Sequence, residues 1–160
     1  MKKLLILFSL SIIFQNCSVN VATEKSNKSA TIEATKTLDQ WHSAASNAQF
    51  ENYFSLMDKD AVFVGTAKEE VWTKKAFMDF AKPYFDKGKA WSFTKISRNI
   101  YFSNHNDIVY FDELLNTWMG VCRGSGVLVK KHNKWLIRHY VLSITVPNDK
   151  IQSVMDVIKK

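Results

Sequence analysis

The chain has 160 residues, of which 46% are hydrophobic and 23% charged, and a formal net charge of +7. A chain of this size and composition is expected to form one folded domain rather than a disordered segment, and two cysteines are too few for a disulfide-stapled scaffold. The basic residues are scattered and form no dense patch interleaved with aromatic residues, so we expect no nucleic-acid partner.

The N-terminus carries the pattern of an export signal. Lys2 and Lys3 precede an apolar run over residues 4–14, which is too short to span a membrane as a helix. Cys17 follows and resembles the lipidated cysteine of a bacterial lipoprotein signal, although Gln15 and Asn16 stand where that signal has small residues. Cleavage by an ordinary signal peptidase therefore stays open as the alternative. The resemblance implies an exported protein anchored to a membrane through lipid on Cys17.

The region after Cys17 divides into three parts by composition. Residues 18–30 are rich in Ser, Asn, Lys and Thr and are expected to form a flexible tether. Residues 31–147 hold the apolar patterns of the folded domain. Residues 148–160 form a tail in which apolar residues recur at the spacing of a short helix.

The first half of the domain has helical patterns. Apolar residues recur every three or four positions from Ala34 to Ala48, which predicts a long amphipathic helix, and residues 50–57 predict a second, shorter one. A compact apolar run over residues 61–65 predicts a strand. Thr73 is a suitable N-cap for a third helix, with Pro83 expected to kink or end its last turn.

The second half of the domain has strand patterns. Four successive segments rich in β-branched and aromatic residues are separated by residues 104–106, 119–120 and 132–133, as in an antiparallel meander. The four segments are residues 91–102, 107–118, 122–130 and 134–146. Helices followed by a run of strands predict an α+β fold, with the helices on one face of a curved sheet.

This order of elements resembles the SnoaL-like branch of the nuclear transport factor 2-like superfamily. The likeness is carried by the stretches LDQWHSAASNAQFENYFSLMDKDAVFVG, FAKPYFDKGKAW, FDELLNTWMGVCRGSGVLVK and KWLIRHYVLSITVPND, which span about residues 38–149. The resemblance implies three N-terminal helices packed on a strongly curved antiparallel sheet, a cone-shaped α+β barrel with a central cavity. Proteins of this kind include isomerases, cyclases, dehydratases, association domains and ligand-binding proteins, so the fold alone does not choose a function.

Side chains able to line such a cavity are aromatic or polar. A buried Trp or Tyr needs a partner for its polar atom, which makes these residues suitable for ligand contacts. The candidates for ligand binding are Trp41, Tyr53, Trp72, Trp91, Trp118, Ser125 and Tyr140.

Few ionisable groups are candidates for the cavity. Asp112 and Glu113 are adjacent on a predicted strand, so only one of them points inward. An even-length loop to the next strand would put Arg123 on the face of Asp112, whereas a three-residue loop or a bulge would put it with Glu113, which we favour. Alternation along the last strand places His139 with Trp135, either as a core histidine or as a proton-transfer group.

Three functional classes follow from these residues. The favoured one is a cavity that binds a small apolar or amphipathic molecule. The second is an isomerase-, cyclase- or dehydratase-type enzyme in which Glu113 or Asp112 moves a proton while Arg123, His139 or Tyr140 stabilises an oxyanion. The third is an association module that forms a homodimer through the sheet face. His42 is expected at the surface, and no metal or other cofactor is expected because the four histidines lack metal-ligand spacing.

Overall fold

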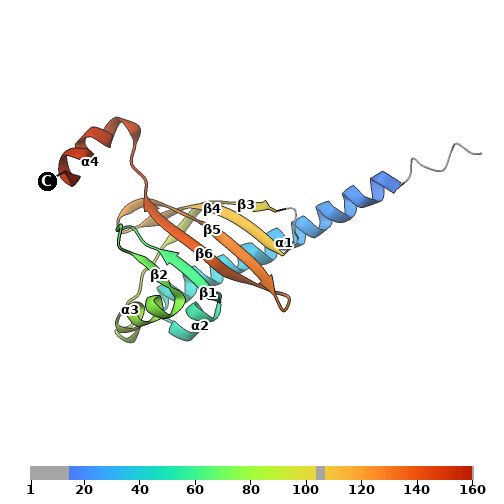
Figure 1. Cartoon of the computed structure of the whole chain (residues 1–160), viewed down its shortest axis with the longest axis horizontal. Coiled ribbons are helices and arrows are strands. Elements are labelled where there is room, and N and C mark those ends of the chain that lie inside the picture. The colour runs from blue at the N-terminus through green and yellow to red at the C-terminus, as the bar shows by residue number, and fades with distance from the viewer. Residues whose placement is uncertain (1–14, 104–106, 160) are drawn as a thin grey trace, which may run out of the picture.

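The computed structural model describes residues 15–103 and 107–159, with side chains from residue 27 onward. Four α-helices and six strands form an α+β fold in which the helices α1–α3 lie against one face of a curved sheet (Figure 1). The helices are α1 (Gln15–Ser46), α2 (Phe50–Ser55), α3 (Lys74–Asp86) and α4 (Ile151–Ile158), with a 3-10 turn η1 (Asn148–Lys150) before α4. The strands are β1 (Met57–Val64), β2 (Val71–Thr73), β3 (Thr94–Phe102), β4 (Ile108–Thr117), β5 (Gly120–Lys131) and β6 (Lys134–Ile144).

The sheet is mixed rather than wholly antiparallel. Its strand order is β2-β1-β6-β5-β4-β3, and β3 to β6 form the expected meander. His132 and Asn133 both have positive φ, as a two-residue hairpin turn with the twist of its flanking strands requires. The expectation of a purely antiparallel sheet is wrong at β1, which runs parallel to β6. The short strand β2, which pairs with β1, was not expected.

The helices form where the apolar spacing predicts them. Ala34, Leu38, Trp41 and Ala45 are buried along α1, and the Thr73 side chain accepts a hydrogen bond from the backbone N–H of Ala76 to cap α3. Pro83 lies inside α3, where the helix continues for one further turn to Asp86. The helical faces and the inner face of the sheet enclose the core.

The N-terminal segment differs from expectation where the structure describes it. Residues 18–30, expected to be a flexible tether, form part of α1. The apolar run at residues 4–14 lies outside the described residues, and of Cys17 the structure describes the backbone, within α1. No helix in the described ranges combines the length and the apolar composition needed to cross a membrane.

Candidate functional site

A carboxylate lies at the centre of the inner sheet face. Val109, Phe111, Glu113 and Leu115 alternate inward along β4, and the Glu113 side chain is fully buried. A carboxylate among apolar neighbours is costly unless it is paired and hydrogen-bonded. The partners of Glu113 therefore define the polar centre of this domain.

Three side chains from different elements bind the two carboxylate oxygens of Glu113. Arg98, from β3, donates to Oε2 through Nε at 2.8 Å and through Nη2 at 2.6 Å. Tyr140, from β6, donates its hydroxyl to Oε1 at 3.0 Å, and His42 Nε2, from α1, lies 2.8 Å from the same oxygen. We call Glu113, Arg98, His42 and Tyr140 the Glu113 cluster.

Arg98 ties this cluster to the helical layer. Its Nη1 donates to the backbone oxygen of Thr35 at 3.2 Å and to Asp39 Oδ1 at 2.7 Å, both on α1. The Arg98 side chain is almost completely buried, so its guanidinium is held by two carboxylates and a carbonyl. The planar guanidinium therefore fixes the orientation of the Glu113 carboxylate and compensates its negative charge.

Opposing influences set the protonation of the cluster. Burial, the largest influence on Glu113, raises its pKa, but the hydrogen bond to His42 and the charges of His42 and Arg98 hold that pKa below its usual value. Burial, followed by the negative charge of Glu113, raises the pKa of Tyr140 far above that of a free phenol. Glu113 is therefore an anion near neutral pH, and Tyr140 remains a neutral donor.

A small cavity of about 170 Å³ lies beside the cluster. His42 and Tyr140 form part of its wall, whereas Glu113 lies behind them. The rest of the wall is mostly aromatic and comes from α1, β1, β2 and the segment between them, α3, the segment before β3, the β4–β5 turn and β6. The lining residues are Trp41, His42, Phe63, Gly65, Thr66, Glu70, Trp72, Phe77, Phe80, Trp91, Phe93, Trp118, Met119, Tyr140 and Leu142.

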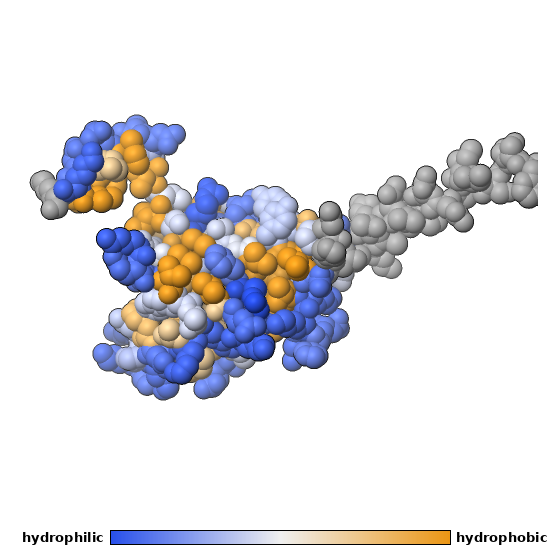
Figure 2. All heavy atoms as spheres, in the orientation of Figure 1, coloured by the Kyte–Doolittle hydropathy of each residue, from blue (hydrophilic) through white to orange (hydrophobic). Residues whose placement is uncertain are grey.

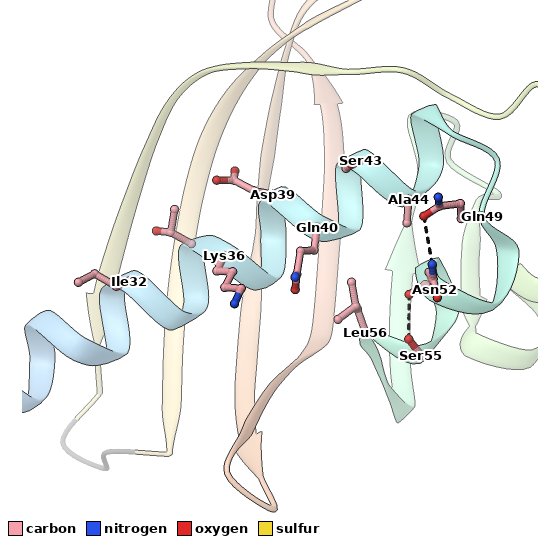
Figure 3. Close-up of a pocket in the computed structure, with 11 residues that line it drawn as sticks. Ile32, Lys36, Asp39, Gln40, Ser43, Ala44, Gln49, Asn52, Ser55 and Leu56 are labelled. Atoms are coloured by element: carbon pink, nitrogen blue, oxygen red, sulfur yellow. Dashed lines mark hydrogen bonds between the residues drawn. The ribbon is translucent and has the colours of Figure 1, made fainter.

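A larger groove of about 890 Å³ runs along the outside of α1 and α2 (Figure 3). Its walls carry Lys36, Gln40 and Asn52, and the Asn52 amide and the Ser55 hydroxyl make hydrogen bonds to neighbouring residues. One of its lining residues, Asp39, connects it to the Glu113 cluster by accepting a hydrogen bond from Arg98. The groove is open and lined by exposed polar groups, so the smaller aromatic cavity is the better candidate for a binding site.

His42 borders a further cleft, of about 300 Å³, on the outer side of the domain. This cleft is formed by α1 and the start of β3, including Ser46 and Lys95. The His42 side chain is 10% exposed. The imidazole thus stands between the aromatic cavity and a solvent-accessible cleft, bonded through Nε2 to a buried anion.

Glu113 points inward as expected, but its expected neighbour Arg123 does not. The turn Trp118-Met119 has two residues, so Arg123 pairs with Leu114 and lies on the outer sheet face. There it meets Asp112 at 3.6 Å, half-exposed. The favoured pairing of Glu113 with Arg123 is wrong because the even-length loop sets the register.

His139 also lies on the outer face, because the alternation along β6 is interrupted. Leu128 pairs with Ile137 whereas the preceding Val127 pairs with His139, so β6 has one extra residue at Arg138. Trp135 and Ile137 point inward before this bulge and Tyr140 after it. The expectation that His139 shares the face of Trp135 is therefore wrong.

The aromatic candidates divide by position. Trp41, Trp72, Trp91, Trp118 and Tyr140 line the cavity, and Trp118 is the most exposed of them. The Tyr53 ring stacks behind Trp41 with centroids 4.7 Å apart, outside the cavity wall. Ser125 lies opposite Asp112 on the outer face.

Two members of the cluster, Arg98 and His42, were missed from the sequence, and both carry a signal. Arg98 alternates with Ile100 and Phe102, the inward residues of β3. His42, expected at the surface, is four residues after Leu38 and three before Ala45 on the buried stripe of α1. The described residues hold no group of three His, Cys, Asp or Glu side chains arranged to bind a metal ion.

Solved structures similar to this chain share its fold at low sequence identity. A protein titled "Putative Scytalone Dehydratase", from Novosphingobium aromaticivorans, has a TM-score of 0.65 at 11% identity, over 77% of this chain and 89% of that one. A "putative dehydratase from the NTF2-like family", from Streptomyces avermitilis, has a TM-score of 0.64 at 11% identity, over 76% and 99%. An NTF2-like protein of unknown function from Pseudomonas putida has 0.63 at 11% identity, over 77% and 92%.

No functionally curated protein matches the chain. The SnoaL-like domain family matches residues 34–147, which hold α2, α3, all six strands and the part of α1 that contributes His42. The family match and the shared fold cover most of the sequence, and this chain belongs to the SnoaL-like domain family.

Proposed function

We propose that the domain binds a small, mainly aromatic molecule in the cavity beside the Glu113 cluster. The observation that carries this proposal is the composition of the wall, which is mostly aromatic with a few polar groups, and in which His42 and Tyr140 are held in place by a buried anion. Binding pockets commonly combine apolar walls with a few fixed polar groups. An apolar cavity of about 150 Å³ accommodates benzene, so a cavity of this size suits one ring or a small bicyclic compound.

The test uses fluorine NMR with 4-fluorophenol and fluorobenzene as probes of the full chain. Both compounds are expected to bind, 4-fluorophenol more tightly because its hydroxyl can hydrogen-bond to polar groups of the wall. Leu142→Trp fills the cavity and should abolish binding, whereas Val141→Trp places the same ring on the outer face of β6 and should leave binding unchanged. Absence of binding at millimolar probe, or equal effects of the two variants, would refute the proposal.

Acid–base catalysis in the same cavity is the second candidate. It is favoured by the contact of His42 with an ionised carboxylate, since such a contact fixes the ring and its proton. In a dehydration, His42 would take the proton next to a carbonyl and pass it to the departing β-hydroxyl, so that the C–O bond breaks, a C=C bond forms and water leaves. Such a reaction matches the titles of two structural neighbours.

A panel of aromatic β-hydroxy ketones tests this second candidate, because loss of water creates a conjugated enone that absorbs ultraviolet light. If the candidate is right, His42→Gln lowers the rate at least 100-fold while retaining 4-fluorophenol binding. Rates equal to buffer for every compound would eliminate dehydration and leave binding as the function.

We further propose that the protein is exported and anchored by lipid at Cys17. The support is the sequence of basic residues, apolar run and cysteine at positions 2–17. Cells grown with an alkyne-labelled fatty acid should yield labelled protein, and Cys17→Ser should remove the label. Unlabelled protein whose N-terminus is a residue other than Cys17 would instead show ordinary signal-peptidase cleavage.

A further inference from the structure

The C-terminal helix α4 has an apolar side without a substantial partner in the described structure. Ile151, Val154, Met155 and Ile158 follow the spacing of one helical face, and no residue of α4 is buried. The main contacts of α4 are with the adjoining turn η1. α4 stands away from the domain (Figure 1), and its apolar atoms gather on the side nearer the domain (Figure 2). We call these four residues the α4 stripe.

The mouth of the aromatic cavity also exposes apolar surface. Trp118, on the turn between β4 and β5, is 83% exposed while it lines the cavity, and Phe80 is 40% exposed. Covering these two aromatic side chains would remove apolar surface from water and would therefore be favourable. A ligand in this open cavity would likewise keep part of its surface in water.

The connection between β6 and α4 starts close to this mouth. The backbone N–H and the hydroxyl of Thr145 both donate to the Val121 oxygen, at 3.1 and 2.6 Å, so the chain is fixed to β5 up to that point. Val121 follows Trp118 by three residues, so this anchor lies within about 10 Å of Trp118.

The length of the remaining chain permits closure. Five residues separate Thr145 from Ile151 and span at most about 20 Å to the start of α4, and an eight-residue helix is about 12 Å long. Rotation about Val146 and about ψ of Pro147, whose φ the ring fixes, would let the α4 stripe reach Trp118.

We propose that α4 closes over the mouth when the cavity holds a ligand, so that the α4 stripe packs on Trp118 and Phe80 and becomes the outer wall of the site. This inference rests on the proposed binding function. A segment tethered by so few residues has an effective concentration in the millimolar range, which favours the chain's own α4 over that of a second copy. Gln152 and Asp156, bonded to each other at 2.9 Å, remain on the solvent side.

The experiment measures how fast 4-fluorophenol leaves the full chain, from fluorine exchange line shapes. Met155→Asp puts a charge into the α4 stripe and is expected to raise the dissociation rate at least tenfold. Ser153→Asp adds the same charge on the opposite side of α4 and is expected to change the rate less than twofold. Equal rates in both variants and the natural chain would overturn the closing of α4 while leaving the binding function intact.

Hydrogen exchange and sedimentation supply the second readout. Adding 4-fluorophenol should slow amide exchange in α4 of the natural chain and leave it unchanged in Met155→Asp. Sedimentation should give the same protein mass with and without the probe. Unchanged α4 exchange would overturn the inference, and so would a ligand-dependent dimer, because α4 would then pack on another copy. Failure of the probe to bind the natural chain, as well as the variants, would refute the binding function itself.

Discussion

Glu113 and Asp112 are neighbours in sequence with opposite environments, which makes them a matched pair for mutation. Glu113→Gln removes the charge that holds Arg98 and leaves a buried guanidinium with reduced compensation. We expect a loss of about 3 kcal/mol in the free energy of unfolding, measured by urea denaturation. Asp112→Asn breaks a half-exposed ion pair and should cost less than about 1 kcal/mol. Equal losses would contradict the importance assigned to the buried cluster.

For single residues, the sequence predicts which face of the sheet a side chain occupies better than it predicts which side chains it contacts. Strand alternation predicts that one of Asp112 and Glu113 points inward, and Glu113 is the buried one. The partners of Glu113 depended on two details: the number of residues in the β4–β5 turn and the bulge at Arg138. Each detail reverses the face of every residue beyond it: the two-residue turn excluded Arg123, and the bulge exchanged His139 for Tyr140.

At the scale of elements, β5 can carry no side chain at the point where it crosses the Glu113 cluster. A Cβ at Gly124 would overlap the Tyr140 hydroxyl and press on Glu113. Gly124→Ala is therefore expected to displace Tyr140 and to cost about 1–3 kcal/mol in the free energy of unfolding. Ser125→Ala, one residue further along β5 on the outer face, should stay within about 0.5 kcal/mol. A fully stable Gly124→Ala in urea denaturation would show that Tyr140 can move without loss.

The elements themselves were largely predictable, and the exceptions have a common cause. The helices α1 to α3 and the meander β3 to β6 carry periodic apolar patterns over enough residues to be recognised. β2 has three residues, too few for a pattern, and forms because β1 supplies its partner. The parallel pairing of β1 with β6 is likewise set by tertiary packing, which local patterns do not encode.

At the scale of the whole molecule, Asp58 clamps the start of β1 to the β5–β6 hairpin. Its buried carboxylate meets Lys131 at 2.6 Å and Arg138 at 2.8 Å. Burial raises the pKa of Asp58, but the hydrogen bonds to Lys131, the Asp60 backbone and Arg138 outweigh it and lower that pKa from 3.8 to about 2. The carboxylate is thus a weaker base in the folded chain than in the unfolded chain.

This shift makes stability depend on acidity in a defined window. The contribution of Asp58 is fully present above about pH 4 and is lost as the pH falls towards 2, because the unfolded chain binds the proton first. The loss amounts to about 2 kcal/mol. Asp58→Asn should show a correspondingly shallower decline in urea-unfolding free energy across this window. Identical declines would show that Asp58 has an ordinary pKa in the folded chain.

The pairing of β1 with β6 also governs the order of events during synthesis. Val62 lies beside His139, 77 residues later, so the ribosome completes the helical layer long before the central partner of β1 exists. Until then β1 presents an open edge to other chains. A nascent polypeptide that stops before Lys134 would keep that edge unpaired, and we expect such fragments to aggregate or to be retained by chaperones rather than to accumulate as partly folded domains.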